Sequence, residues 1–310
     1  MLQRVISFFF IFLCACTTSR KSADILQISK ESYCDPPTGM IPNGPVLSHN
    51  ADSLLAANQH LSSKYSASSI LVLYALGILE DVNQIYLLKK DSLNSVKELL
   101  LRRHINDKIL LGEADISSLA AELDCEGERI DQIAKYVDDI NSKRTTKFTV
   151  TSIIVGALAG VAGSVISNSG WNKGVAITAG AAAIGLGLAT LNPKGRKAAL
   201  THQRNLLRDI WLQENNHDIS PFIWFMLTEK RISNTGNNSL VENLKQRWIK
   251  YQFDGNANKA QHSVIFTDGG IYRASDLHNR AEMLNQLQAE IRSLAQPLNI
   301  FLRELSDYVP

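Results

Sequence analysis

The sequence predicts an all-α fold: a helical bundle with a central Gly/Ala-rich, transmembrane-type helical hairpin, one small β-hairpin and a long C-terminal heptad helix. Apolar residues recur every three or four positions over most of the chain, which is the helical period. Two segments, 148–167 and 174–191, contain no charged residue. Strand-forming residues flank a turn in one place, 263–273.

The averages over the 310 residues hide this organisation. Values of 45% hydrophobic and 20% charged residues are ordinary for a soluble protein, but the apolar residues are concentrated in 5–16 and 148–191. The net charge of +2 and the pI near 8.3 argue against a strongly basic nucleic-acid-binding protein. We therefore expect no nucleic-acid partner.

The first residues have the layout of an export signal. Arg4 supplies a positive charge, and the apolar run 5–13 that follows is too short to span a bilayer. The junction Leu13-Cys14-Ala15-Cys16 then resembles a bacterial lipobox, although Cys14 departs from the Ser, Thr or Ala that is usual there. The resemblance implies a lipoprotein signal peptide at 1–15 and a covalent lipid, such as palmitate, on Cys16. No other cofactor is expected.

The resemblance also implies a location. Two or three acyl chains, at about 0.8 kcal/mol per buried CH₂, hold a protein stably on a membrane. Thr17 follows Cys16 where Asp would retain the protein in the inner membrane of enteric-type bacteria. The expected location is the bacterial cell envelope, lipid-anchored in the outer membrane and facing the periplasm. An uncleaved anchor and an ordinary signal peptide are the alternatives.

Residues 16–47 are predicted to form a flexible tether because they contain four of the eight prolines. After signal removal the free thiols are Cys34 and Cys125, an even pair in an oxidising compartment, so a disulfide is plausible. Two unpaired cysteines are the alternative. The spacing excludes a zinc cluster, and no metal is expected.

The N-terminal helical region is predicted at 48–147. Breaks are expected near 66–69, at 91–92 and at 112–115, where Asp115 is expected to cap the following helix. Gly127 lies in the middle of an apolar stripe. Glycine there weakens the helix by about 1 kcal/mol relative to alanine, which would be tolerated if another segment approached closely.

The hydrophobic hairpin is predicted at 148–192. Each uncharged arm is about 27 to 30 Å long as a helix, close to the hydrocarbon thickness of a bilayer. Small residues line one face of each arm and allow close helix association in lipid. The glycines expected to pack are Gly156, Gly160, Gly163, Gly174 and Gly185. The hairpin is expected to close on itself or on neighbouring copies, giving a homo-oligomer.

Basic residues flank the hairpin on one side. They form the predicted lipid-headgroup collar, which consists of Lys143, Arg144, Lys147, Lys194, Arg196 and Lys197. Each such charge near an anionic membrane surface contributes about 1 kcal/mol. Trp171, at the tip between the arms, is the predicted interface anchor. Membrane lipids are therefore the expected partners.

Three interpretations of the hairpin compete: constitutive insertion in a membrane, burial in a bundle with release on membrane contact, and a permanent place in a soluble core. The second would resemble α-helical pore-forming toxins. The low hydrophobicity of the arms would let an exported protein pass the inner membrane. In this respect the block is similar to the glycine-zipper hairpins of small outer-membrane lipoproteins, over about 45 residues and with less regular glycine spacing.

The C-terminal helical region is predicted at 193–310. Ser220-Pro221 and the capping box at Ser239 mark helix starts. Residues 263–266 and 271–273 are predicted to pair as the β-hairpin. The last segment is predicted as a long packing or coiled-coil helix with a kink at Pro297. Its heptad positions are Leu277, Leu284, Leu287, Ile291, Leu294, Leu298, Phe301 and Leu305.

Motifs for chemistry are not found. The seven histidines have no metal-ligand spacing, and the sequence contains no nucleophile elbow, Walker loop or Rossmann fingerprint. Gly185-Leu186-Gly187 lies inside the uncharged block, where no phosphate site follows. An enzyme is therefore not expected. The leading hypothesis is an envelope lipoprotein with a structural, assembly or transport role that oligomerises through its glycine-rich hairpin, alone or in an envelope complex. A pore-forming or membrane-inserting effector is the alternative.

Overall fold

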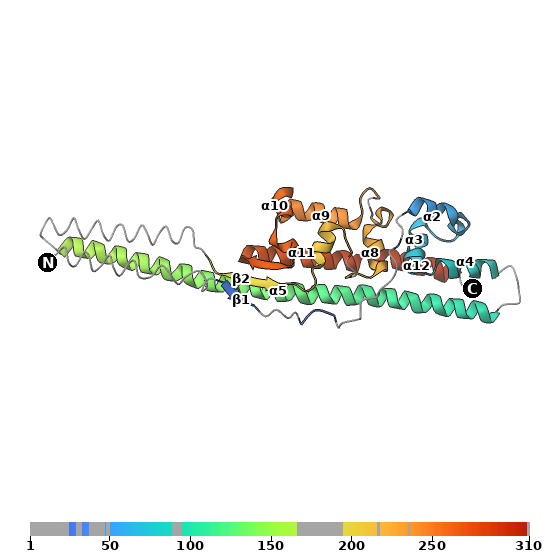
Figure 1. The fold of residues 1–310 in the computed structure, drawn as a ribbon, viewed down its shortest axis with the longest axis horizontal. Coiled ribbons are helices and arrows are strands. Elements are labelled where there is room, and N and C mark those ends of the chain that lie inside the picture. Colours follow the sequence, from blue (N-terminus) through green and yellow to red (C-terminus); the bar gives the residue numbers. More distant parts are fainter. Residues whose placement is uncertain are drawn as a thin grey trace. The chain divides into compact units, whose positions relative to one another are not determined.

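The computed structural model describes residues 25–28, 33–36, 47, 50–88, 95–165, 195–215, 218–234 and 236–308. This part of the chain is mostly helical, with one small sheet (Figure 1). The α-helices are α2 (Ala51–Ala57), α3 (Ala67–Ala75), α4 (Leu79–Leu88), α5 (Ser95–Val165), α7 (Leu206–Leu212), α8 (Pro221–Thr228), α9 (Leu240–Tyr251), α10 (Ala257–Gln261), α11 (Ala274–Ser293) and α12 (Ala295–Tyr308). Short 3₁₀ turns are η1 (Gln59–Ser63), η2 (Lys230–Ile232) and η3 (Val264–Phe266).

The chain divides into two compact units. We call the first the sheet unit; it consists of Met1–Ser29, Asp131–Leu200 and Gly270–His278. We call the second the core unit; it consists of Lys30–Ile130, Thr201–Gly269 and Asn279–Pro310. Helix α5 contributes residues to both units.

The sheet has three strands in the order β1-β2-β3, namely β1 (Ile25–Gln27), β2 (Lys197–Thr201) and β3 (Gly269–Tyr272). β1 and β2 are parallel. The tether predicted at 16–47 therefore contributes a strand. Ala198 and Leu200 point into the interior and are buried, whereas their neighbours along the strand are not. This alternation explains why a short, weakly apolar segment forms a strand.

The predicted β-hairpin is wrong. Residues 264–266 form the 3₁₀ turn η3, and β3 belongs to the three-stranded sheet. Ser263 starts the turn because its hydroxyl accepts a hydrogen bond from the backbone of Ile265. The side-chain amide of Asn205 donates to the carbonyls of Ile265 and Thr267, at 3.0 and 2.8 Å. These carbonyls are therefore satisfied by a distant side chain and need no strand partner.

Helix α5 runs through the predicted break at 112–115, so that prediction is also wrong. Gly112 does not break the helix; its missing side chain lets Leu76 pack closely against α5. A Cβ atom at Gly112 would lie 2.6 Å from Cδ2 of Leu76. The carboxylate of Asp115 hydrogen-bonds the hydroxyl of Ser220 and caps no helix. At Gly127 a Cβ would lie 2.7 Å from Oδ1 of Asn285, so the condition under which a glycine is tolerated there, the close approach of another segment, is met. The break predicted at 91–92 lies outside the described residues.

The core unit is built on α3, α8, α9 and α12. Helix α3 packs on α8 and α12, and α8 packs on α9. Residues 70–73 of α3 and 222–227 of α8 are buried on all sides, which places these two short helices at the centre. Two predicted caps are present: Ser220 caps α8, and Ser239 with Glu242 forms the capping box of α9. Ser66, at the break predicted near 66–69, caps α3.

The heptad prediction is confirmed as a buried stripe, but its helix is divided into α11 and α12. The break falls between Ser293 and Ala295, before the predicted kink at Pro297. The reason is that the proline ring clashes with the carbonyl four positions earlier, which belongs to Ser293. Leu277, Leu284, Leu287, Ile291, Leu294, Leu298 and Phe301 are buried. Their partners include α3 of the same chain, which packs on α12.

Among the described residues, no helix taken singly combines the length and hydropathy needed to cross a membrane. Helices α3 and α4 reach this length and hydropathy only when taken together, and the chain bends by 113° between them. Most of the predicted hairpin, from residue 166 to 192, lies outside the described residues, as do Gly174, Gly185 and Trp171.

Candidate functional site: the base of the hairpin and its anchor

Asn141 and Arg196 hold the two chain segments that flank the predicted hairpin side by side. The backbone N–H of Arg196 donates to Oδ1 of Asn141 at 2.7 Å, and Nδ2 of Asn141 donates to the Arg196 carbonyl at 3.3 Å. Gly195 makes this approach possible, because a Cβ there would lie 3.0 Å from the Asn141 amide. Residues 142–195 therefore begin and end at one place. We call this pair of hydrogen bonds the Asn141 clasp.

The register of the sheet brings the N-terminal segment to the same place. Ile25 is paired with Lys197 in parallel strands, so the chain enters both strands from the same end of the sheet. Lys197 directly follows the residue held by the Asn141 clasp. Cys16 precedes Ile25 by nine residues, which span at most about 30 Å of extended chain. The predicted lipidation site is thus joined to the base of the predicted hairpin by no more than this length of chain.

Five of the six predicted collar residues are described, and all five lie at this base. On α5, Lys143, Arg144 and Lys147 follow Asn141 within two turns, and Lys143 and Lys147 are exposed. Arg196 and Lys197 lie on the other flank of the clasp and are half-buried. The guanidinium of Arg144 lies over the ring of Phe148, 5.6 Å from its centroid. Lys194 lies outside the described residues. The clasp therefore brings basic residues from both flanks together.

Apolar side chains beyond the collar are exposed. Val150, Ile153 and Ile154 are 48%, 64% and 52% exposed, on the part of α5 where the first hairpin arm begins. Gly156, Gly160 and Gly163 follow within the same helix. Large exposed apolar side chains on neighbouring turns are unusual for a soluble helix and indicate a contact beyond those that the described residues make.

His278 fixes the remaining part of the sheet unit to α5. Its Nε2 lies 2.8 Å from Oδ2 of Asp138, and its Nδ1 lies 3.5 Å from Oδ1 of Asp131. These carboxylates are seven residues apart, about two helical turns along one face of α5, so one imidazole between them reaches both. Neither Asn141 nor His278 was predicted from the sequence to have these roles. No local pattern marks them, because their partners are 55 and 140 residues away.

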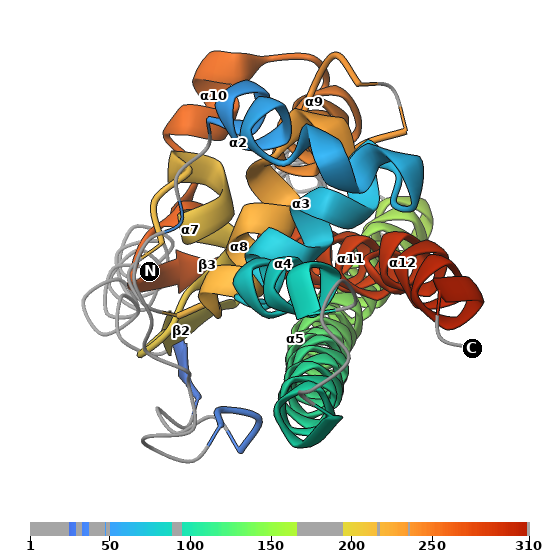
Figure 2. The ribbon, with the colours of Figure 1, turned by 90° about the vertical axis from the view of Figure 1, so that its right-hand side faces the viewer.

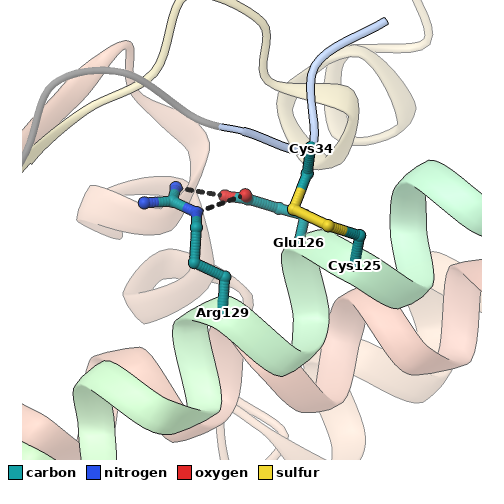
Figure 3. Close-up of a disulfide and its surroundings, with 4 residues drawn as sticks. All are labelled: Cys34, Cys125, Glu126 and Arg129. Atoms are coloured by element: carbon teal, nitrogen blue, oxygen red, sulfur yellow. Dashed lines mark hydrogen bonds and ion pairs between the residues drawn. A yellow bond between two sulfur atoms is a disulfide. The ribbon is translucent and has the colours of Figure 1, made fainter.

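In the core unit, Cys34 and Cys125 are joined by a disulfide, with 5.6 Å between their Cα atoms. These are the two cysteines that the sequence nominated as a pair. Figure 3 shows the bridge beside the ion pair of Glu126 and Arg129, whose two hydrogen bonds are each 2.8 Å long. The disulfide ties residue 34 to the middle of α5. Disulfides persist in oxidising compartments, so the bridge agrees with export.

Next to the disulfide, the core unit contains a small cavity lined by three carboxylates and one guanidinium. Arg204 lies 2.8 Å from Glu122 and 3.4 Å from Asp218, and Asp115 lines the same cavity. The pKa of Glu122 is raised to about 7, mainly because burial disfavours its ionised form. The charge of Arg204 opposes this rise, and the charges of Asp35, Asp218 and Glu126 add to it. Burial and the charge of Asp218 likewise raise the pKa of Asp209 to about 6.

Replacement of Glu122 by Gln tests this cluster. Because the folded pKa of about 7 exceeds the ordinary 4.5, the wild-type core binds this proton more tightly when folded and loses stability as the pH rises between these values. Relative to Glu122→Gln, the wild-type free energy of unfolding should fall by up to about 3 kcal/mol over that interval. Urea unfolding at pH 5 and pH 8 measures the difference. Parallel pH profiles for the two proteins would contradict it.

A second buried cluster surrounds Arg280, which is 1% exposed. Its Nη1 donates to Oδ1 of Asn205 at 3.1 Å and to the Ile265 carbonyl at 3.0 Å, and its Nη2 lies 3.4 Å from Nδ1 of His202. Burial together with the charges of Arg280 and Arg129 lowers the pKa of His202 to about 2. His202 is therefore neutral and can accept a hydrogen bond from Arg280, an arrangement that supports the core.

Within the described ranges, no group of three or more His, Cys, Asp or Glu side chains is placed to hold a metal ion. No known protein family, no curated protein and no solved structure matches the chain. The assignment of a function therefore depends on the geometry of the molecule itself.

Proposed function

We propose that this chain is a bacterial envelope lipoprotein, held by a lipid on Cys16 and by insertion of the glycine-rich hairpin 148–192 into the same membrane. Its role is structural, in assembly or in transport, and it oligomerises through the hairpin. One observation carries the proposal: the sheet register and the Asn141 clasp bring the N-terminal segment, both flanks of the hairpin and the basic collar to one place.

The physical argument is that these features act on one membrane surface. A lipid anchor and a hairpin at opposite ends of a protein would compete for orientation, whereas at one place their free energies of membrane binding add. Lys143 and Lys147 are placed where they meet anionic headgroups when the hairpin is inserted. The Cys34–Cys125 disulfide supports the same assignment because it requires an oxidising compartment.

Exposure of the first hairpin arm favours constitutive insertion over the alternatives. A hairpin stored in a bundle, as in a pore-forming effector, or one kept permanently in a soluble core, would bury Val150, Ile153 and Ile154. Each of these side chains is about half exposed or more. A bilayer would cover them at no cost in polar desolvation, which is the arrangement that the proposal requires.

The experiment combines two changes in the native host. We expect the wild-type protein to incorporate labelled palmitate and Cys16→Ser to lose the label. Cys16→Ser should nevertheless remain in the membrane pellet after carbonate extraction, because the hairpin still holds it. Cys16→Ser with residues 148–192 replaced by a short Gly/Ser linker should move to the soluble fraction.

Two outcomes would overturn parts of the proposal. Palmitate labelling that persists in Cys16→Ser would show that Cys16 is not the lipidated residue. Release of Cys16→Ser by carbonate would refute constitutive insertion of the hairpin. If the released protein then caused leakage of anionic liposomes, the pore-forming alternative would be favoured.

A further inference from the structure

One face at the start of α5 is exposed and mainly apolar. Its residues are arranged symmetrically on either side of the middle of the face. Positions 96, 100, 103, 107, 110 and 114 lie within about 40° of one line along the helix, at 100° per residue. The apolar members of this face and its edges are Val96, Leu99, Leu100, Leu110 and Leu111, which are 70%, 66%, 61%, 62% and 58% exposed. We call this surface the α5 face.

The opposite side of the same helix packs against the rest of the core unit. Ile105, Ile109 and Ile116 point away from the α5 face and are buried. In Figure 2 the helices α3, α4 and α12 lie together on one side of α5. The helix therefore has one side occupied by its own chain and one side with large aliphatic groups exposed to water. Exposed apolar surface of this extent on consecutive turns marks an interaction site.

The centre of the α5 face is charged, and its charges are complementary to themselves. Arg103 and Asp107 lie one turn apart, with 3.9 Å between Arg103 Nε and Asp107 Oδ2 and side chains 79% and 60% exposed. An exposed pair of this kind contributes little within one chain. If a second α5 is laid antiparallel with its two-fold axis at position 105, Arg103 of each copy faces Asp107 of the other.

The apolar residues obey the same symmetry. The two-fold axis that pairs 103 with 107 also pairs Leu100 with Leu110 and Val96 with Ala114, while Leu99 and Leu111 flank the contact. The spacing alternates between three and four residues, as in an antiparallel coiled coil in which the two core positions alternate across the seam. A surface that matches itself through a two-fold axis is the requirement for a closed dimer.

We propose that the α5 face is a homodimer interface in which residues 96–114 of two copies pack antiparallel over about 27 Å, with two central Arg103–Asp107 ion pairs between layers of leucine. A membrane surface fits this face less well, because insertion would bring both central charges into the apolar phase. This inference does not depend on the proposed function, since it uses neither the hairpin nor the lipid.

Cysteine cross-linking of the full-length protein in detergent tests the geometry. In the antiparallel dimer, Leu100 of one copy is adjacent to Leu110 of the other. The double variant Leu100→Cys/Leu110→Cys should therefore form a covalent dimer on mild oxidation. Leu100→Cys alone should not, because the two copies of position 100 are about 15 Å apart along the seam. Efficient cross-linking of the single variant would indicate parallel pairing and overturn the proposal.

Charge exchange tests the complementarity independently. Arg103→Asp places carboxylates against each other at both central layers, so the dimer dissociation constant from analytical ultracentrifugation should rise by about tenfold or more. Asp107→Arg should do the same. The double variant Arg103→Asp/Asp107→Arg restores both pairs and should return the constant to near the wild-type value, while circular dichroism monitors folding of each protein.

Gly160→Leu separates this interface from association through the hairpin. It alters a predicted hairpin contact and leaves the α5 face unchanged, so the Leu100→Cys/Leu110→Cys cross-link should persist in its presence. A cross-link that disappears with Gly160→Leu, or a wild-type protein that stays monomeric at its highest soluble concentration, would overturn the proposal.

Discussion

Removal of the Cys34–Cys125 disulfide is expected to lower the free energy of unfolding by about 4 kcal/mol, because the bridge closes a loop of 91 residues in the unfolded chain. Cys34→Ala/Cys125→Ala avoids placing a hydroxyl at position 34, which is buried. Urea unfolding followed by the fluorescence of Trp211, Trp224 and Trp248 reports on the core unit, where all three are buried.

The same experiment contains its own control. Wild-type protein treated with a reductant should unfold at the midpoint of the double variant, and the double variant should not respond to reductant. Non-reducing peptide mapping of protein from the native host should recover Cys34 and Cys125 in one peptide pair. Two free thiols in that protein, or equal midpoints for wild type and variant, would show that the bridge contributes nothing to stability in the native compartment.

Arg280→Ala is expected to cost about 3 kcal/mol of stability. The change empties a site that is 1% exposed in the wild type and removes the donor to Asn205, His202 and the Ile265 carbonyl. Loss of buried volume and of buried hydrogen bonds both act in this direction. Arg292→Ala is the matched control, because Arg292 lies on the same helix and is exposed, and its effect should stay below about 0.5 kcal/mol.

A second readout distinguishes the role of Arg280 from simple packing. Its charge contributes to the low pKa of His202, about 2, so NMR should show that pKa rising in the variant. Since the folded pKa of His202 lies below its ordinary 6.5, the wild type loses stability as the pH falls below that value. The variant should lose less, and the difference in unfolding free energy should narrow between pH 7 and pH 4. A constant difference would mean that the charge does not act on His202.

The helical periods and the caps could be read from local sequence because they depend on residues within a few positions of each other. The stripe from Leu277 to Phe301 is buried as its spacing predicts, and Ser220 and Ser239 cap helices as predicted. The pairing of Cys34 and Cys125 could be nominated by counting, since they are the two free thiols that remain if the predicted signal is removed and Cys16 carries a lipid.

The wrong predictions share a cause: contacts with residues distant in the sequence outweighed the local preferences from which the predictions were made. Gly112 looked like a break because glycine lowers helix propensity, but Leu76 and Phe222 use the space that its missing side chain leaves. Residues 263–273 looked like a hairpin, but Asn205 satisfies the carbonyls of the first half and β2 lies beside β3 in the sheet. Propensity sets a preference of about 1 kcal/mol, which tertiary packing readily exceeds.

The sequence by itself determined the helical class and the uncharged block, because each is a matter of composition or short spacing. The lipobox-like junction and the basic collar stay predictions from the same kind of local pattern. Only the tertiary structure decided that Ile25 pairs with Lys197 and that Asn141 holds Arg196. These contacts join residues 55 to 172 positions apart, and no local pattern encodes them. They bring β1 and the two flanks of the predicted hairpin together because backbone hydrogen bonds, once buried, must be satisfied by whichever segment the fold brings near.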